Sequence, residues 1–268
     1  MLIMKHIAIL FALIAATSTD AWAQDMEQKN ITLTATQTAP VGEIEYKSVT
    51  LNCDNLHGVV ILIPTQLTLT DGNEGEIEVS YPAVEEPYIN FDVRDGEFII
   101  GRNGHVEIPK NSVISEHVPI KVKVSSSNIR RILANADSIV TIERDVFNPN
   151  LEICNGNALG LNANSITAEQ SIEIINTGTL TCDIRDWNTK LLTINNMGYL
   201  YIDGATTANN ITHNSMGIDH TELDVECQKL EIVSNGKGLI CYSGTADEVN
   251  ITSMGKALIR TSELNVIE

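Results

Sequence analysis

The phrase that decides the fold reads Leu192-Thr193-Ile194-Asn195-Asn196-Met197-Gly198. Related phrases recur through the C-terminal half and begin at 151, 172, 192, 211, 230 and 249, so the steps between them are 21, 20, 19, 19 and 19 residues. A nearly fixed period of about 20 residues is typical of a solenoid, in which each repeat packs on its neighbours. Because stacking occupies most residues of a solenoid, we expect any local function on the outer surface or at the ends.

Apolar residues occupy the first and third positions of each copy and alternate with mostly polar ones. The third position holds Ile153, Ile174, Ile194, His213, Ile232 and Ile251. Such a period of two indicates a strand with one buried face. There is neither the helical period of about 3.6 residues nor a leucine-rich repeat frame. The sequence therefore predicts an all-β fold, a parallel β-helix-like solenoid.

Two further positions of the repeat are polar or small. The fifth position holds Asn155, Asn176, Asn196, Ser215, Ser234 and Ser253. We expect these side chains to stack as a hydrogen-bonded ladder. The seventh position holds Gly178, Gly198, Gly217, Gly236 and Gly255, after Asn157 in the first copy. Since Gly and Asn tolerate positive φ, this column predicts the corner of each coil.

The N-terminal half has strand patterns without the repeat. Candidate strands are Ile31–Ala35, Ile44–Asn52, Val59–Ile63, Thr65–Thr70, Ile77–Tyr81, Ile89–Val93, Phe98–Ile100 and Ile120–Val124. Asp71-Gly72 and Asp95-Gly96 are hairpin-type turns between apolar alternations. We expect residues 24–128 to be a β-rich region packed on a solenoid of about seven coils over 129–268, with 24–268 forming one domain.

The first 23 residues have the pattern of a signal peptide. A short basic start precedes an apolar run from Ile7 to Ala16 and the A-x-A site Ala21-Trp22-Ala23. The apolar run is too short to span a bilayer as a helix, and no later segment is long and apolar enough. We therefore expect an exported protein without a transmembrane segment, located in the periplasm, at the cell surface or outside the cell.

The net charge limits which partners the protein can bind, and the cysteine positions bear on whether disulfides form. The formal net charge is −18, which disfavours nucleic acid and acidic membranes as partners. The five cysteines are Cys53, Cys154, Cys182, Cys227 and Cys241. Within the repeat, no two of them share a column in adjacent coils, so we predict buried free thiols and no disulfide framework.

Several stretches between roughly Val49 and Ile259 share a family pattern: Arg94-Asp95-Gly96-Glu97-Phe98-Ile99-Ile100, the corners Asn176-Thr177-Gly178, Asn196-Met197-Gly198, Ser234-Asn235-Gly236-Lys237-Gly238 and Ser253-Met254-Gly255, and the late strand Leu239-Ile240-Cys241-Tyr242-Ser243-Gly244. In these stretches the chain resembles the auto-transporter adhesin head domain, or GIN domain, of secreted Gram-negative proteins. The resemblance implies a right-handed β-helix-like fold and an adhesive or cell-surface role. It supplies no catalytic residues.

Carboxylates are the best candidates for catalysis or metal binding, because right-handed β-helices also occur in polysaccharide-active enzymes. Asp183 and Asp203 share one offset in neighbouring copies and would lie about 4.8 Å apart along the stack. Such a pair can shift a pKa or bind a cation, and solvated turn carboxylates with Arg185 as a neighbour are the alternative. We expect no catalytic site and no cofactor beyond weak calcium binding at this pair.

Aromatic residues are the best candidates for ligand binding. Tyr199 and Tyr201 flank the inward-pointing Leu200 and should point outward, and we place Trp187 on the outer stretch of the preceding coil. The alternative is that these rings only cover strand faces, because Tyr favours strands. His213 replaces isoleucine in a buried column, so we interpret it as a hydrogen-bonded interior histidine.

Three function classes remain open. The main hypothesis is a non-enzymatic adhesin or surface-binding module whose ligand is a glycan or a protein. The second is a β-helix enzyme acting on polysaccharide, and the third is a structural envelope scaffold. A groove of aromatics and carboxylates would favour the enzyme, a single aromatic patch would favour binding, and a featureless outer face would favour the scaffold.

Overall fold

The structure, a computed structural model, describes residues 45–104, 119–144, 146–147 and 149–266. All of them belong to one compact unit, Thr32–Glu268. Of the residues that the structure describes, 77% lie in strands and 3% in helix. The strands are β1 (Tyr46–Asn52), β2 (Gly58–Ile61), β3 (Thr65–Thr70), β4 (Glu76–Pro82), β5 (Ile89–Arg94), β6 (Glu97–Arg102), β7 (Ile120–Ser125), β8 (Arg131–Ala134), β9 (Ser138–Ile142), β10 (Val146–Phe147), β11 (Asn150–Asn155), β12 (Ala158–Asn176), β13 (Thr179–Asn196), β14 (Tyr199–Ser215), β15 (Ile218–Ser234), β16 (Lys237–Ser253) and β17 (Lys256–Val266), with one 3-10 helix, η1 (Ala83–Tyr88). The expected signal peptide and the candidate strand Ile31–Ala35 lie outside the described residues.

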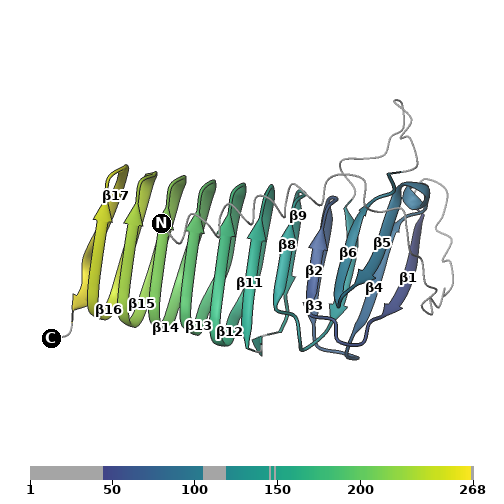
Figure 1. Ribbon diagram of the computed structural model, residues 1–268, viewed down its shortest axis with the longest axis horizontal. Helices are drawn as coiled ribbons and strands as arrows, with labels where there is room; N and C mark the ends of the chain where they lie inside the picture. The colour runs from purple at the N-terminus through teal and green to yellow at the C-terminus, as the bar shows by residue number, and fades with distance from the viewer. Residues whose placement is uncertain (1–44, 105–118, 145, 148, 267–268) are drawn as a thin grey trace. The chain divides into compact units, whose positions relative to one another are not determined.

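The repeats form a parallel β-solenoid of about seven turns, as the sequence predicts (Figure 1). Strands β12 to β17 each pair in parallel with the next. The third position of the repeat forms one file, in which Ile174 pairs with Ile194, Ile194 with His213, and His213 with Ile232. These side chains are fully buried, so each coil supplies one layer of the core.

The coil of β13 is divided into segments where the alternation of buried and exposed side chains breaks. In β13 two successive residues are exposed at Arg185–Asp186 and again at Lys190–Leu191. Two neighbours can both point outward only where the chain changes direction, because side chains alternate along a straight strand. The coil of β13 therefore has three segments, 179–184, 186–190 and 191–196. The third bend follows at Met197–Gly198.

The corner glycines are required by close packing between coils. The expected positive φ is wrong for this column, since the glycines with positive φ are Gly75, Gly96, Gly204, Gly238 and Gly244. A Cβ atom at Gly198 would lie 1.9 Å from the carbonyl oxygen of Gly178. That same oxygen accepts a hydrogen bond from the backbone N–H of Tyr199 at 2.8 Å. The neighbouring backbone thus occupies the space that a side chain would need.

The N-terminal strands continue two of the solenoid's faces, but not in chain order. Strand β2 lies between β6 and β8, and β3 lies between β7 and β9, all in parallel. At the end of the stack β1, β4 and β5 run antiparallel to their neighbours. We propose that these strands and the later coils fold as one domain, because both faces are continuous across the junction.

The two predicted hairpin turns differ in outcome. Asp95 and Gly96 have φ of 50° and 77° and connect the antiparallel pair β5–β6, as predicted. The prediction at Asp71-Gly72 is wrong, because β7 lies between β3 and β4 and pairs with both. A local turn signal cannot reveal a later segment that inserts between its two strands.

Two further features, the cysteines and the helices, bear on which class of protein this is. All five cysteines are free, and four of them are buried while Cys241 is partly exposed. Within the described ranges, no helix has the length and apolar character needed to cross a membrane.

Candidate functional site

A polar ladder runs through the interior of the solenoid beside the isoleucine file. The Asn155 amide Nδ2 donates to Asn176 Oδ1 at 2.8 Å, and Asn176 Nδ2 donates to Asn196 Oδ1 at 2.9 Å. Asn176 also donates to the backbone oxygen of Tyr199 at 2.8 Å. All three amides are at most 3% exposed. The ladder therefore ties adjacent coils together at the turn and has no face open to a ligand.

The ladder ends in a buried network centred on His213. His213 Nδ1 lies 2.9 Å from the Tyr242 hydroxyl, and Nε2 lies 3.0 Å from Asp219 Oδ2. Asp219 also accepts hydrogen bonds from Asn196 Nδ2 at 3.1 Å and from the Thr221 hydroxyl at 2.6 Å. The interpretation of His213 as a hydrogen-bonded interior residue is confirmed.

Burial decides what this network can do. The side chains of His213 and Asp219 are 0% exposed, and Tyr242 is 2% exposed. Burial opposes ionisation of Asp219, but His213 and the hydrogen bonds that the carboxylate accepts hold its pKa below the usual value. Although a His–Asp pair also occurs in catalytic triads, this one cannot meet a substrate. We interpret it as a structural centre of the core.

Asp219 is a residue that the sequence reasoning missed. It pairs with Leu200 and stands in the file that holds Leu159 and Leu180 in earlier coils. The signal was present, because counting along the repeat places Asp219 at the same buried position as these leucines. An aspartate next to His220 looks like a turn residue when the column is not followed.

The predicted carboxylate pair is exposed on the first segment of the coils. Asp183 and Asp203 are register partners on β13 and β14, as counted from the sequence. The Tyr201 hydroxyl donates to Asp203 Oδ2 at 3.3 Å, and the nearby carboxylate of Asp203 raises the pKa of Tyr201. Arg185 lies 3.6 Å from Asp186 rather than beside Asp183. Among the described residues no group of three or more potential ligands could hold a metal ion, so calcium binding here stays a prediction.

Exposed apolar and aromatic side chains gather on two neighbouring coils beside these carboxylates. Tyr199 is 38% and Tyr201 43% exposed on β14, and Met216 and Ile218 are 53% and 45% exposed. Tyr199 pairs with Ile218 and Tyr201 with His220 across β14 and β15. The rings of Tyr199 and His220 are 5.8 Å apart between centroids. We call these five residues the aromatic patch.

One residue predicted for this surface is not there. Trp187 is 1% exposed and belongs to the core, so its placement on the outer stretch is wrong. The two outward residues Arg185 and Asp186 shift the alternation by one position, which turns the next side chain inward. Met216, Ile218 and His220 complete the patch instead. Their positions relative to the repeat could have shown them to be outward-facing neighbours of the two tyrosines.

The fold and this surface define a class of protein, a parallel β-solenoid with an exposed apolar and aromatic patch. The chain belongs to the family described as "putative auto-transporter adhesin, head GIN domain", whose model matches residues 55–218. No curated protein matches the chain.

Several solved structures are similar to the chain at low identity. A putative adhesin from Bacteroides fragilis has 14% identity and a TM-score of 0.49, and the match covers 81% of this chain and 97% of that one. A putative adhesin from Parabacteroides merdae has 15% identity and a TM-score of 0.49, covering 85% and 99%. A protein described as a putative lipid binding protein, from Parabacteroides distasonis, has 14% identity and a TM-score of 0.49, covering 81% and 96%.

Proposed function

We propose that the protein is an exported, non-enzymatic adhesin that binds a glycan or a protein on a surface through the aromatic patch. Family membership supports an adhesive role, and the pattern of residues 1–23 supports export. The observation that carries the proposal is the exposure of Tyr199 and Tyr201 on one strand, with the exposed Ile218 as the register partner of Tyr199. Grouped exposed apolar side chains on a soluble protein typically mark an interaction site.

The pairing of the strands that carry the aromatic patch favours ligand binding. Its strands, β14 and β15, are hydrogen-bonded on both sides to neighbouring coils. A surface held in this way loses little backbone freedom when a ligand docks, so more of the contact energy remains as affinity. Tyrosine rings present an apolar face and a polar hydroxyl, which suits both sugar rings and protein side chains.

The positions of the histidine and carboxylate side chains favour ligand binding over catalysis. The best-organised histidine and carboxylate, His213 and Asp219, are fully buried. The exposed carboxylates Asp183 and Asp203 lie on a sheet face, and the Tyr201 hydroxyl donates to Asp203. A polysaccharide-cleaving site needs an acid and a base that converge on one bond, and this arrangement supplies charge without that convergence.

A binding screen tests the proposal. Residues 24–268 would be applied to arrays of glycans and of surface proteins, with calcium and with a chelator. We expect saturable binding to a defined glycan or protein. Binding that disappears in the chelator would assign a role to the pair Asp183 and Asp203. The absence of any saturable ligand, or turnover of an arrayed polysaccharide, would contradict an adhesin of this kind.

A further inference from the structure

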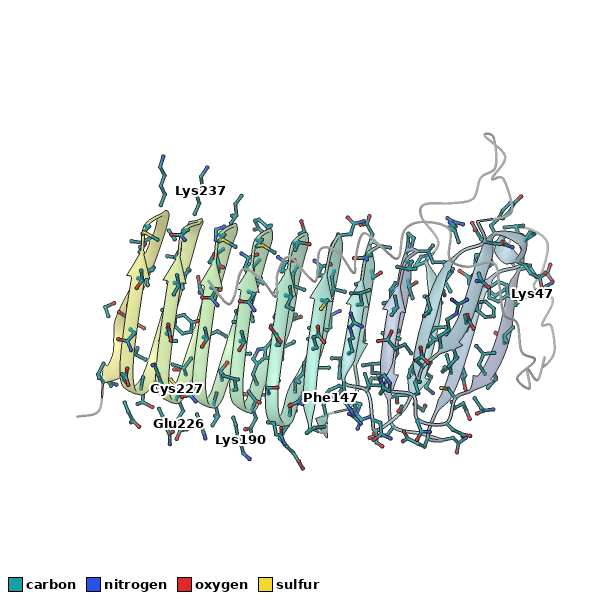
Figure 2. All side chains as sticks on the ribbon, in the orientation of Figure 1. Lys47, Phe147, Lys190, Glu226, Cys227 and Lys237 are labelled. Carbon is teal, nitrogen blue, oxygen red and sulfur yellow. The ribbon has the colours of Figure 1, made fainter. Side chains whose placement is uncertain are left out.

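A second surface feature, on the middle segment of the coils, is not used by the proposed function. It is an open groove of about 490 Å³ that crosses β12 to β16. Figure 2 shows Lys190, Glu226 and Cys227 along the lower edge of the coils, whereas Lys237, beside the glycine corner, lies at the upper edge. The groove is therefore a separate surface from the corner that carries Met216.

Two files of outward-pointing side chains form the walls of the groove. One wall is Thr167, Asn188, Thr207, Glu226 and Thr245, which are register partners from coil to coil. The residues between the walls, such as Ala168 and Ala208, are buried and point inward. The floor is consequently main chain, and a ligand can approach the backbone between the walls.

The second wall stands at the bend that follows the middle segment. It consists of Glu169, Lys190, Asn209, Gln228 and Asp247. These side chains are exposed. Together the walls carry hydroxyl, amide and carboxylate groups and one ammonium group, and they repeat at the spacing of the coils, about 4.8 Å. A ligand that runs along the axis would meet a similar set of donors and acceptors at each step.

The backbone pairing limits which ligand can use this groove. The central strands β13, β14 and β15 are each paired in parallel with a coil on both sides. An extended peptide therefore cannot add to them as a further strand, because that mode needs an unpaired edge. Recognition must come from side chains.

Charge excludes a second class of ligand. Three carboxylates, Glu169, Glu226 and Asp247, outnumber the single ammonium group of Lys190 in the walls. The chain as a whole carries a net charge of −18. Phosphate, sulfate or uronate chains would be repelled. A ligand rich in hydroxyl groups and free of charge matches the walls, since each hydroxyl can donate and accept a hydrogen bond.

We propose that this groove binds a neutral, unbranched oligosaccharide laid along the solenoid axis. Hydroxyl groups of successive sugar units bond to Asn188, Thr207 and Gln228 and to their neighbours in the two walls. The groove is open and polar, so we expect weak affinity for a single chain, with a Kd on the order of 1 mM. This site stands or fails independently of the aromatic patch.

Titration calorimetry with neutral hexasaccharides tests the proposal. The probes are cellohexaose, xylohexaose, mannohexaose and laminarihexaose, with heparin as a charged comparison. The blocking variant is Thr207→Trp, because Thr207 is exposed in the middle of one wall. Its matched control is Thr212→Trp on the same strand, beyond the bend at Asn209–Asn210. A second variant, Asn188→Ala with Gln228→Ala, removes hydrogen-bonding groups without adding bulk.

We expect at least one hexasaccharide to bind, and Thr207→Trp and the double alanine variant to weaken it about tenfold or more. Thr212→Trp should leave its affinity unchanged. The proposal is overturned if none of the hexasaccharides binds, if heparin binds more tightly than all of them, or if Tyr199→Ala with Tyr201→Ala removes binding while the groove variants keep it. If Thr207→Trp fails to fold, the double alanine variant decides.

Discussion

His213 Nε2 lies 3.0 Å from Asp219 Oδ2, and both side chains are completely buried inside the solenoid. Each replaces an aliphatic residue of its file, since His213 pairs with Ile194 and Asp219 with Leu200. Two neighbouring coils have thus exchanged apolar packing for a polar centre. Taking two such groups out of water has a large desolvation cost, which only their mutual contact and further hydrogen bonds offset.

Replacing one member of this pair should therefore destabilise the protein more than replacing both. We expect His213→Ile alone to destabilise the fold by about 3–5 kcal/mol, because it leaves Asp219 buried without its main partner. Adding Asp219→Leu should recover most of that loss, since both aliphatic files are then restored. Chemical denaturation of the two single variants and the double variant measures the coupling. Simple additivity of the two single effects would contradict the network.

The same pair predicts a dependence of stability on pH. The pKa of Asp219 is lowered from 3.8 in the folded state. Its stabilising contribution is therefore fully present above the unfolded value and is lost as the pH falls through the folded value. As the pH is lowered below about pH 4, the melting temperature of the wild type should fall more steeply than that of the double variant, His213→Ile with Asp219→Leu. Parallel curves would show that Asp219 does not contribute.

The asparagine ladder should be costly to interrupt in the interior and not at the end of the stack. Asn176→Ala removes the donor to Asn196 and to the Tyr199 carbonyl and the acceptor for Asn155. We expect a loss of about 2–4 kcal/mol from the buried groups that lose their partner. Ser253→Ala, at the exposed last position of the same column, is the control and should change stability by less than about 0.5 kcal/mol.

The corner glycines should resist even the smallest side chain. At Gly198 a Cβ atom would lie 1.9 Å from the Gly178 oxygen, whereas at Gly104 no atom of the described residues lies within 4 Å of it. Gly198→Ala should lower the free energy of unfolding by about 3 kcal/mol or more, because the coils must move apart. Gly104→Ala should melt close to the wild type. Equal melting of the two variants would mean that the coils are not in close contact at this corner.

The isoleucine file can be tested directly at Ile194. This residue is 0% exposed and lies between Ile174 and His213. Ile194→Asp should lower the melting temperature sharply, since it buries an unpaired carboxylate. Thr193→Asp, on the neighbouring partly exposed position, is the matched control. An unchanged melting temperature for Ile194→Asp would mean that the Ile194 side chain does not lie in the core.

The sequence predicts the solenoid well because its files repeat. The isoleucines, the asparagines and the glycines each recur at one offset, and a periodic pattern is visible without any long-range information. The glycine column shows a limit of this reasoning, since the column was found but its cause was not. Positive φ and close approach both select glycine, and only the neighbouring carbonyl oxygen, such as that of Gly178, distinguishes them.

Two kinds of feature could not be predicted. One is a shift in the alternation of inward and outward side chains, and the other is the insertion of one strand between strands distant in the sequence. Trp187 turns inward because Arg185 and Asp186 both point outward, and composition does not reveal such a shift. The position of β2 and β3 between later strands depends on pairings far apart in the chain, for which no repeat exists. Tyr199 and Tyr201 were found because they flank an inward leucine on a straight segment, where strict alternation holds.

The most direct test of the binding role is the affinity of the aromatic patch for the ligand found in the array screen. Titrations would compare the wild type with Tyr199→Ala and Tyr201→Ala combined, and with Leu191→Ala, a control that is 39% exposed at a different bend. We predict that the tyrosine variant binds about tenfold or more weakly at an unchanged melting temperature, and that Leu191→Ala binds like the wild type. Equal affinity in all three proteins would contradict a binding role for the patch.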